Sequence, residues 1–96
     1  AISHYETVIR LHPENTTALN NLAWLLREKD LEQGLRLAER AAQLAPENGA
    51  VQDTYGWLLH LDGQNSAALA TLEKALALAP ESKEISEHLE AVRQAL

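Results

Sequence analysis

The chain has 96 residues, of which 46% are hydrophobic, which suits one globular domain rather than a disordered segment. Its formal net charge of −6 argues against a nucleic-acid partner, because such binding rests on clustered Lys and Arg. The lack of cysteine excludes disulfides and thiolate metal sites, and no run of about 18 apolar residues is present, so we expect no membrane insertion.

Apolar residues recur with a helical period in six segments along the chain. From the N-terminus, these segments cover about residues 2–11, 16–28, 31–44, 49–61, 66–78 and 83 onward. The connections between them are short, so consecutive helices must pack antiparallel. No strand pattern competes with this reading, and the predicted fold class is all-α.

Three related triplets separate these helices into pairs. They are Pro13-Glu14-Asn15, Pro46-Glu47-Asn48 and Pro80-Glu81-Ser82, with the prolines 33 and 34 residues apart. Proline ends one helix because it lacks an N–H, and the Asn or Ser two places on is suited to cap the next helix. A fixed period near 34 residues in a helical chain predicts a solenoid of helix pairs.

The residues inside each period resemble the tetratricopeptide repeat (TPR) pattern, over essentially the whole chain. One repeat reads Leu19, Leu22-Ala23, Leu26, Gly34, Ala38, Ala41 and Pro46, and the next reads Gln52, Tyr55-Gly56, Leu59, Ala68, Leu72, Ala75 and Pro80. The resemblance implies a right-handed α-solenoid of antiparallel helix pairs, called helix A and helix B in each repeat. The small residues are expected where helix A and helix B of one repeat approach closely.

This pattern assigns residues 1–96 to a single TPR array. Residues 1–13 match helix B of a truncated repeat, 16–48 and 49–82 match complete repeats, and 83–96 match a C-terminal capping helix in which Glu90 departs from the motif. The second repeat has a glycine turn at Asp62-Gly63, whereas the first has Lys29-Asp30. We therefore expect a tighter turn there or an earlier end of its helix A.

The first residue is not Met and lies inside an amphipathic run, so we expect a fragment of a longer TPR protein. A helix B without its own helix A leaves apolar surface uncovered, since repeats bury their faces only against neighbours. We expect residues 1–11 to fray or to self-associate.

No constellation of catalytic or metal-binding residues is visible. The four histidines, His4, His12, His60 and His88, are never as close as the i, i+3 or i, i+4 spacing of helical metal sites, and are interpreted as exposed. The glycines are isolated, so no phosphate-binding loop exists. We expect no enzyme, no metal and no cofactor.

Trp24 and Trp57 occupy the same place in successive repeats, one residue after a small residue. One interpretation is a core or half-core role. The resemblance to TPR proteins instead implies that both rings lie on helix A and face a concave groove, where aromatic residues are enriched at binding hot spots. The predicted groove residues are Trp24, Trp57, Asn20, Asn21, Arg27, Asp53, His60, Glu84, Glu87 and His88, with Thr17 on the same face.

TPR arrays are protein-interaction scaffolds, and the resemblance implies that role here, with a neutral or basic peptide favoured by the groove acids. Some TPR domains clamp a C-terminal carboxylate with Lys, Arg and Asn. The matching places hold Asn20, Trp24, Thr54, Glu84 and His88, so that mode is not expected. The alternative is a structural spacer or oligomerisation segment without a groove ligand.

The phrases Asn20-Asn21-Leu22-Ala23-Trp24-Leu25-Leu26 and Tyr55-Gly56-Trp57 also resemble TPR proteins of bacterial exopolysaccharide and protein-sorting systems. The compartment stays open between the bacterial periplasm and the cytoplasm.

Overall fold

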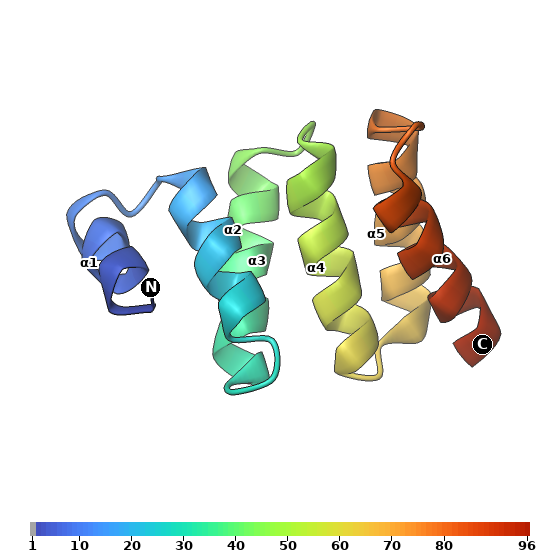
Figure 1. Ribbon diagram of the computed structural model, residues 1–96, viewed down its shortest axis with the longest axis horizontal. Helices are drawn as coiled ribbons and strands as arrows, with labels where there is room; N and C mark the ends of the chain where they lie inside the picture. Colours follow the sequence, from blue (N-terminus) through green and yellow to red (C-terminus); the bar gives the residue numbers. More distant parts are fainter. Residues whose placement is uncertain (1) are drawn as a thin grey trace.

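The computed structural model describes residues 2–96, which form six α-helices and no strand (Figure 1). The helices are α1 Ile2–Leu11, α2 Thr16–Leu25, α3 Leu31–Leu44, α4 Gly49–Leu61, α5 Asn65–Leu78 and α6 Lys83–Ala95. The predicted all-α fold is confirmed. All six segments are found, although α2 ends three residues before the expected end at Glu28.

The capping role predicted for the three triplets is confirmed. The side chain of Asn15 accepts a hydrogen bond from the Ala18 N–H at the start of α2. Asn48 and Ser82 accept in the same way at the starts of α4 and α6. Each cap satisfies one of the backbone donors that the first turn of a helix leaves without a partner. The period in the sequence therefore marks where every second helix begins.

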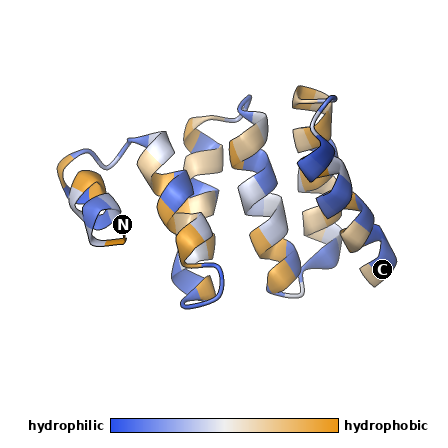
Figure 2. Cartoon of the chain, viewed as in Figure 1, coloured by the Kyte–Doolittle hydropathy of each residue, from blue (hydrophilic) through white to orange (hydrophobic). Residues whose placement is uncertain are grey.

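The helices pack in sequence order into an elongated array of 38 × 25 × 19 Å. In Figure 1, α2 lies in front of α3 and α6 lies in front of α5, while α1 stands at one end of the row. Helix α4 packs on α3, α5, α2 and α6, and so stands at the centre. Figure 2 shows the apolar residues as stripes on the helices rather than as continuous segments.

Three clusters of buried apolar residues fill the spaces between these helices. Leu59, Ala68, Leu72, Leu89 and Val92 join α4, α5 and α6; Leu19, Ala41, Ala42 and Val51 join α2, α3 and α4; Ala23, Ala38 and Leu58 join the same three helices at another level. Each cluster takes residues from at least three helices. The array is thus held by contacts between neighbouring pairs as well as within them.

Two glycines stand where an added Cβ would come unusually close to a neighbouring helix. A Cβ on Gly34 would lie 3.1 Å from Leu58 Cδ2 and 3.2 Å from the Ala23 carbonyl oxygen. A Cβ on Gly56 would lie 2.7 Å from Leu72 Cγ. The close approach predicted from the small residues is therefore present at both positions, and it is tighter at Gly56.

The two inter-helix turns differ as their sequences do. Gly63 has a φ of 85°, a left-handed conformation that glycine adopts without a steric cost, and its N–H bonds to the His60 carbonyl. The first repeat lacks this glycine, and α2 ends at Leu25. The Asp30 N–H then bonds to the Leu26 carbonyl and the Asp30 side chain caps α3. Of the two alternatives, a tighter turn or a helix A that ends one residue early, the structure has an early end, and α2 ends earlier than by that one residue.

The terminal helices are covered to different degrees. Helix α1 has no buried residue, and Leu11 at its end is 64% exposed. Helix α6 buries Ile85, Leu89 and Val92 while Glu90 faces solvent. The first helix is thus the more weakly packed of the two.

Candidate binding surface

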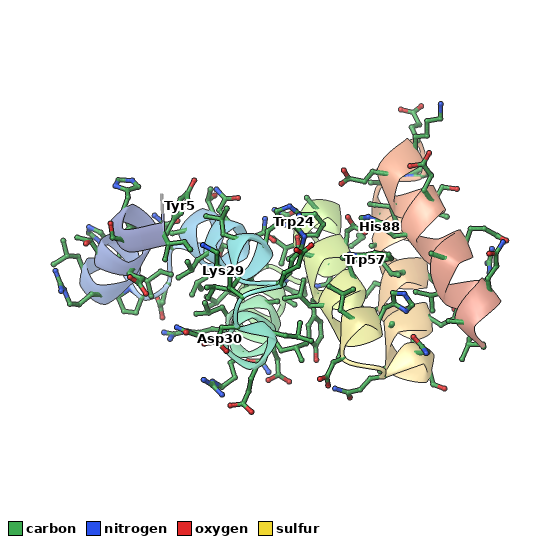
Figure 3. All side chains as sticks on the ribbon, turned by 60° about the horizontal axis from the view of Figure 1, so that its bottom comes forward. Tyr5, Trp24, Lys29, Asp30, Trp57 and His88 are labelled. Atoms are coloured by element: carbon green, nitrogen blue, oxygen red, sulfur yellow. The ribbon has the colours of Figure 1, made fainter. Side chains whose placement is uncertain are left out.

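Aromatic and imidazole rings from α2, α4 and α6 form a ladder across one face of the array. His88 stacks on Trp57, with ring centroids 4.3 Å apart and planes inclined by 22°. The ring centroid of Trp24 lies 6.2 Å from that of the same imidazole, and the ring centroids of His60 and Trp57 are 4.9 Å apart. The Arg27 guanidinium covers Trp24 at 4.2 Å, a cation–π arrangement. The labelled rings can be followed in Figure 3.

Both indoles are half-buried. They pack against the cluster of Ala23, Ala38 and Leu58 and also present surface beside it. Each ring therefore shares the two roles considered above. Part of it supports the core, and the rest is available on the face that α2 and α4 share.

A buried hydrogen bond joins Asp53 of α4 to the ladder residue His88 of α6. The Asp53 carboxylate Oδ1 lies 2.8 Å from His88 Nδ1, and the two side chains are only 6% and 16% exposed. The sequence predicts Asp53 as a groove residue and the histidines as exposed. For His88 the predicted exposure is wrong, because its side chain is buried against Asp53 between two helices.

The surroundings of His88 favour its charged form. Burial works against protonation, but the hydrogen bond from His88 to Asp53 and the charges of Asp53, Glu84 and Glu87 outweigh it, and the pKa of His88 is raised above its usual 6.5. His88 therefore keeps its proton to higher pH than an exposed histidine would.

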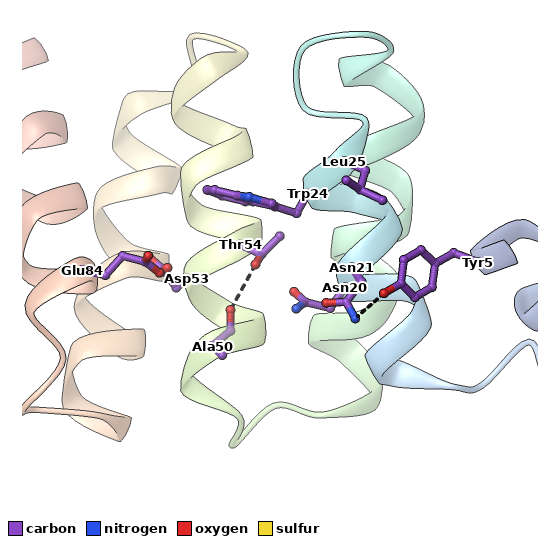
Figure 4. A pocket seen from close by; sticks show the side chains of 9 residues that line it. All are labelled: Tyr5, Asn20, Asn21, Trp24, Leu25, Ala50, Asp53, Thr54 and Glu84. Carbon is purple, nitrogen blue, oxygen red and sulfur yellow. Dashed lines mark hydrogen bonds between the residues drawn. The ribbon is translucent and has the colours of Figure 1, made fainter. Parts of the chain in front are cut away.

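Beside the ladder lies a groove of about 510 Å³, whose lining is shown in Figure 4. Its walls come from α1, α2, α4 and α6. The lining residues are Tyr5, Asn20, Asn21, Trp24, Leu25, Ala50, Asp53, Thr54 and Glu84. One wall thus carries the amides of Asn20 and Asn21 and the indole of Trp24, and the opposite wall carries the carboxylates of Asp53 and Glu84.

The two asparagines on α2 differ in their bonding. Asn21 Nδ2 donates to the Tyr5 hydroxyl at 3.3 Å, which ties α1 to α2 at the edge of the groove. Asn20 Oδ1 is buried and has no hydrogen-bond partner within residues 2–96. A buried acceptor without a partner is costly, so this oxygen would gain from any donor that reached it.

The predicted groove residues fall into two adjacent sets. Asn20, Asn21, Trp24, Asp53 and Glu84 line the groove, whereas Arg27, Trp57, His60 and His88 belong to the ladder. Glu87 is exposed and acts on His88 through its charge, and Thr17 is exposed and lines neither set.

Four lining residues are absent from the predicted groove set: Tyr5, Leu25, Ala50 and Thr54. Ala50 could have been found from its place three residues before Asp53 on the same helix face. Tyr5 could not, since its place depends on how α1 packs.

Within residues 2–96, no three His, Asp or Glu side chains lie together in a way that could hold a metal ion. None of the helices in this range is long and apolar enough to cross a bilayer.

Comparison with known proteins identifies the architecture. The chain is 32% identical over 84 residues to a TPR repeat-containing protein of Pseudomonas aeruginosa. The chain is built of tetratricopeptide repeats. The match covers 85% of the chain but 14% of that relative, so the chain spans a small part of the relative's length. No family model matches the sequence.

Solved TPR structures superpose closely. The first TPR of Spaghetti, bound to the HSP90 peptide SRMEEVD, has a TM-score of 0.89 at 21% identity and covers 98% of this chain and 75% of its own. The Arabidopsis OM64 TPR domain has a TM-score of 0.90 at 22% identity, and the match covers 100% of this chain and 80% of that domain's chain. The TPR2B domain of yeast Sti1, in complex with pHsp70, has a TM-score of 0.88 at 18% identity, and the match covers 100% of this chain and 82% of that domain's chain. At these identities the similarity establishes the α-solenoid fold.

Proposed function

We propose that this TPR array is a non-enzymatic protein-interaction module that binds a peptide or protein segment in the groove between α2, α4 and α6. The observation that carries the proposal is the groove itself, a concave space of about 510 Å³ with Trp24 on one wall and the carboxylates of Asp53 and Glu84 on the other. TPR repeats are protein–protein interaction modules, and two of the similar structures are named as peptide or chaperone complexes.

The groove chemistry favours a neutral or basic segment. Trp24 offers an apolar surface, and half-buried tryptophans are common anchors at protein interfaces. Glu84 is exposed beside Asp53 and gives this wall a negative potential. We therefore expect a ligand with an apolar residue close to Lys or Arg, and an affinity that falls as salt concentration rises.

A ligand held through a free C-terminal carboxylate does not fit this groove. The places that match the Lys, Arg and Asn of a TPR clamp hold Asn20, Trp24, Thr54, Glu84 and His88, none of which is Lys or Arg. Thr54 donates its hydroxyl to the Ala50 carbonyl. Arg27 is already bonded to the Trp24 carbonyl. A terminal carboxylate would thus face Glu84 without a bidentate partner.

The proposal is tested by selecting binding peptides from a displayed library and measuring them against two matched variants. Ala50 is an exposed alanine on α4 that lines the groove, and Ala70 is an exposed alanine on α5 that does not. Ala50→Arg should place a long cation in the groove and reduce binding at least tenfold, while Ala70→Arg should leave it unchanged. Equal affinities for the two variants would contradict groove binding.

A second function, self-association, is favoured by the exposure of α1. This helix buries no residue, and its partly exposed Ile2, Val8 and Ile9 accompany the exposed Leu11. Pairing of two such helices would cover these side chains. Analytical ultracentrifugation of wild type and Leu11→Ser tests this: a concentration-dependent dimer weakened by Leu11→Ser supports it, and a monomer at millimolar concentration excludes it.

A further inference from the structure

Asp53 lies on the border between the groove and the ring ladder. It lines the groove, yet its Oδ1 atom is bonded to His88 Nδ1 at 2.8 Å and the side chain is 6% exposed. Glu84, which lies close to Asp53 in Figure 4, lines the same wall and is exposed. The wall that would meet a basic ligand thus already has an internal cation available to it, the protonated imidazole of His88.

The charges around His88 come from several helices. Asp53 of α4 contacts it directly, and Glu84 and Glu87 of α6 act on it through their charges. His60 stands on the Trp57 side and shares a 2.6 Å contact with Asn65. The cation of α2, Arg27, is stacked on Trp24. The charges that act on the imidazole are therefore those of three carboxylates, Asp53, Glu84 and Glu87.

We propose that a Lys or Arg side chain of the bound segment lies against Asp53 and Glu84 and weakens the hold of His88 on its proton, so that binding of a basic segment is coupled to partial proton release to solvent. This inference rests on the groove function proposed above. Neutral His88 can still donate Nδ1–H to Asp53, so the contact between α4 and α6 survives the loss of the charge.

The direction of the coupling follows from electrostatics. A ligand cation near Asp53 takes over part of the attraction that held the proton on His88, and it repels the imidazolium. The raised pKa of His88 in the free protein agrees with this, since the acids that raise it are the acids the ligand would neutralise. Basic segments should bind more tightly as pH rises, whereas neutral segments should not respond.

Three capped peptides serve as probes: acetyl-Leu-Lys-Leu-Lys-Leu-amide and its counterparts with Gln or Glu in place of Lys. Binding to the intact chain is followed by NMR at the amides of Ala50 and Thr54, and the pKa of His88 is measured from its ring protons with and without peptide. Between about pH 5.5 and about pH 8.5, affinity for the Lys peptide should rise about threefold to tenfold, with a matching fall in the His88 pKa.

Two variants test whether the pH dependence comes from the proton of His88. His88→Gln should abolish the pH dependence of Lys-peptide affinity, whereas His12→Gln, at an exposed turn outside the groove, should retain it. A Lys peptide that binds at Ala50 and Thr54 without moving the His88 pKa would overturn this inference while leaving the groove function intact. Failure of all three peptides, and of library peptides, to perturb the groove would overturn both.

Discussion

Replacing Gly56 by Ala tests how closely helices α4 and α5 approach. The new Cβ would stand 2.7 Å from Leu72 Cγ and 2.9 Å from Leu72 Cδ2, closer than real Cβ contacts allow. Leu72 is completely buried, so it cannot move into solvent. The Leu72 backbone nitrogen, 3.3 Å from the new atom, limits any shift of the helix.

The magnitude combines two opposing effects. Overpacking a core costs roughly 1–3 kcal/mol, and removing a glycine from a helix interior returns up to about 1 kcal/mol. The 2.7 Å contact with buried Leu72 places the overpacking cost in the upper part of that range, at about 2–3 kcal/mol. Gly56→Ala should therefore lower the free energy of unfolding by about 1–2 kcal/mol, or the melting temperature by about 4–16 °C.

Gly34→Ala is the matched control, because it adds the same methyl group at the close approach of helices in the other repeat, where Gly34 of α3 faces Ala23 of α2. Its nearest contacts are the end of the Leu58 side chain at 3.1 Å and the Ala23 carbonyl at 3.2 Å, which require shifts of only tenths of an ångström. We expect it within about 1 kcal/mol of wild type, neutral or stabilising. Urea unfolding followed by circular dichroism measures both. If Gly34→Ala were the more destabilised variant, the packing argument and the repeat register would both be wrong.

Four further outcomes are expected. Trp24→Ala, which removes the indole that lines the groove, should weaken binding of library-selected peptides by at least about 1–2 kcal/mol. Trp57→Ala should lower the melting temperature through the lost His88 stack yet leave a folded helical array, and a variant unfolded at 25 °C would contradict this. Because the pKa of His88 is raised by folding, its contribution to stability should be complete below about pH 6.5 and be lost as pH rises through the folded-state value; pH-dependent urea midpoints should show a smaller decline in His88→Gln. Backbone amides of α1 should exchange faster than those of α4 by NMR, and equal protection would show that α1 is covered.

The fold could be predicted from sequence because local and tertiary signals coincide. Asn15 and Asn48 cap helices at the repeat period, and these local bonds need no knowledge of the rest of the chain. Ala23 and Gly34 occupy places where only small residues allow the helices to meet. The early end of α2 was predictable too, since Lys29-Asp30 replaces the glycine turn.

The sequence could predict only which helix faces carry the site. Helix periodicity gives the direction in which a side chain points but not the residue that it contacts. Asp53 was predicted for the groove face and lines the groove, but its burial depends on His88, which lies 35 residues away on α6. Gln52 is similar: it stands at a large-residue position of the repeat, and its amide is buried because it donates to the Ala42 and Pro46 carbonyls. Such pairings are set by tertiary contacts, which one sequence without relatives does not specify.

The Asp53–His88 pair links the stability of the array to the ligand it can accept. The proton on His88 stabilises the folded chain through Asp53, and under the proposal above the same carboxylate receives the ligand cation. Thermodynamic linkage makes the two effects reciprocal: whatever factor the ligand removes from proton affinity, the proton removes from ligand affinity. Raising the pH should therefore reduce the stability of the free array while strengthening its binding to a basic segment. A protein in which both quantities moved in the same direction with pH would require a different partner for Asp53 in the bound state.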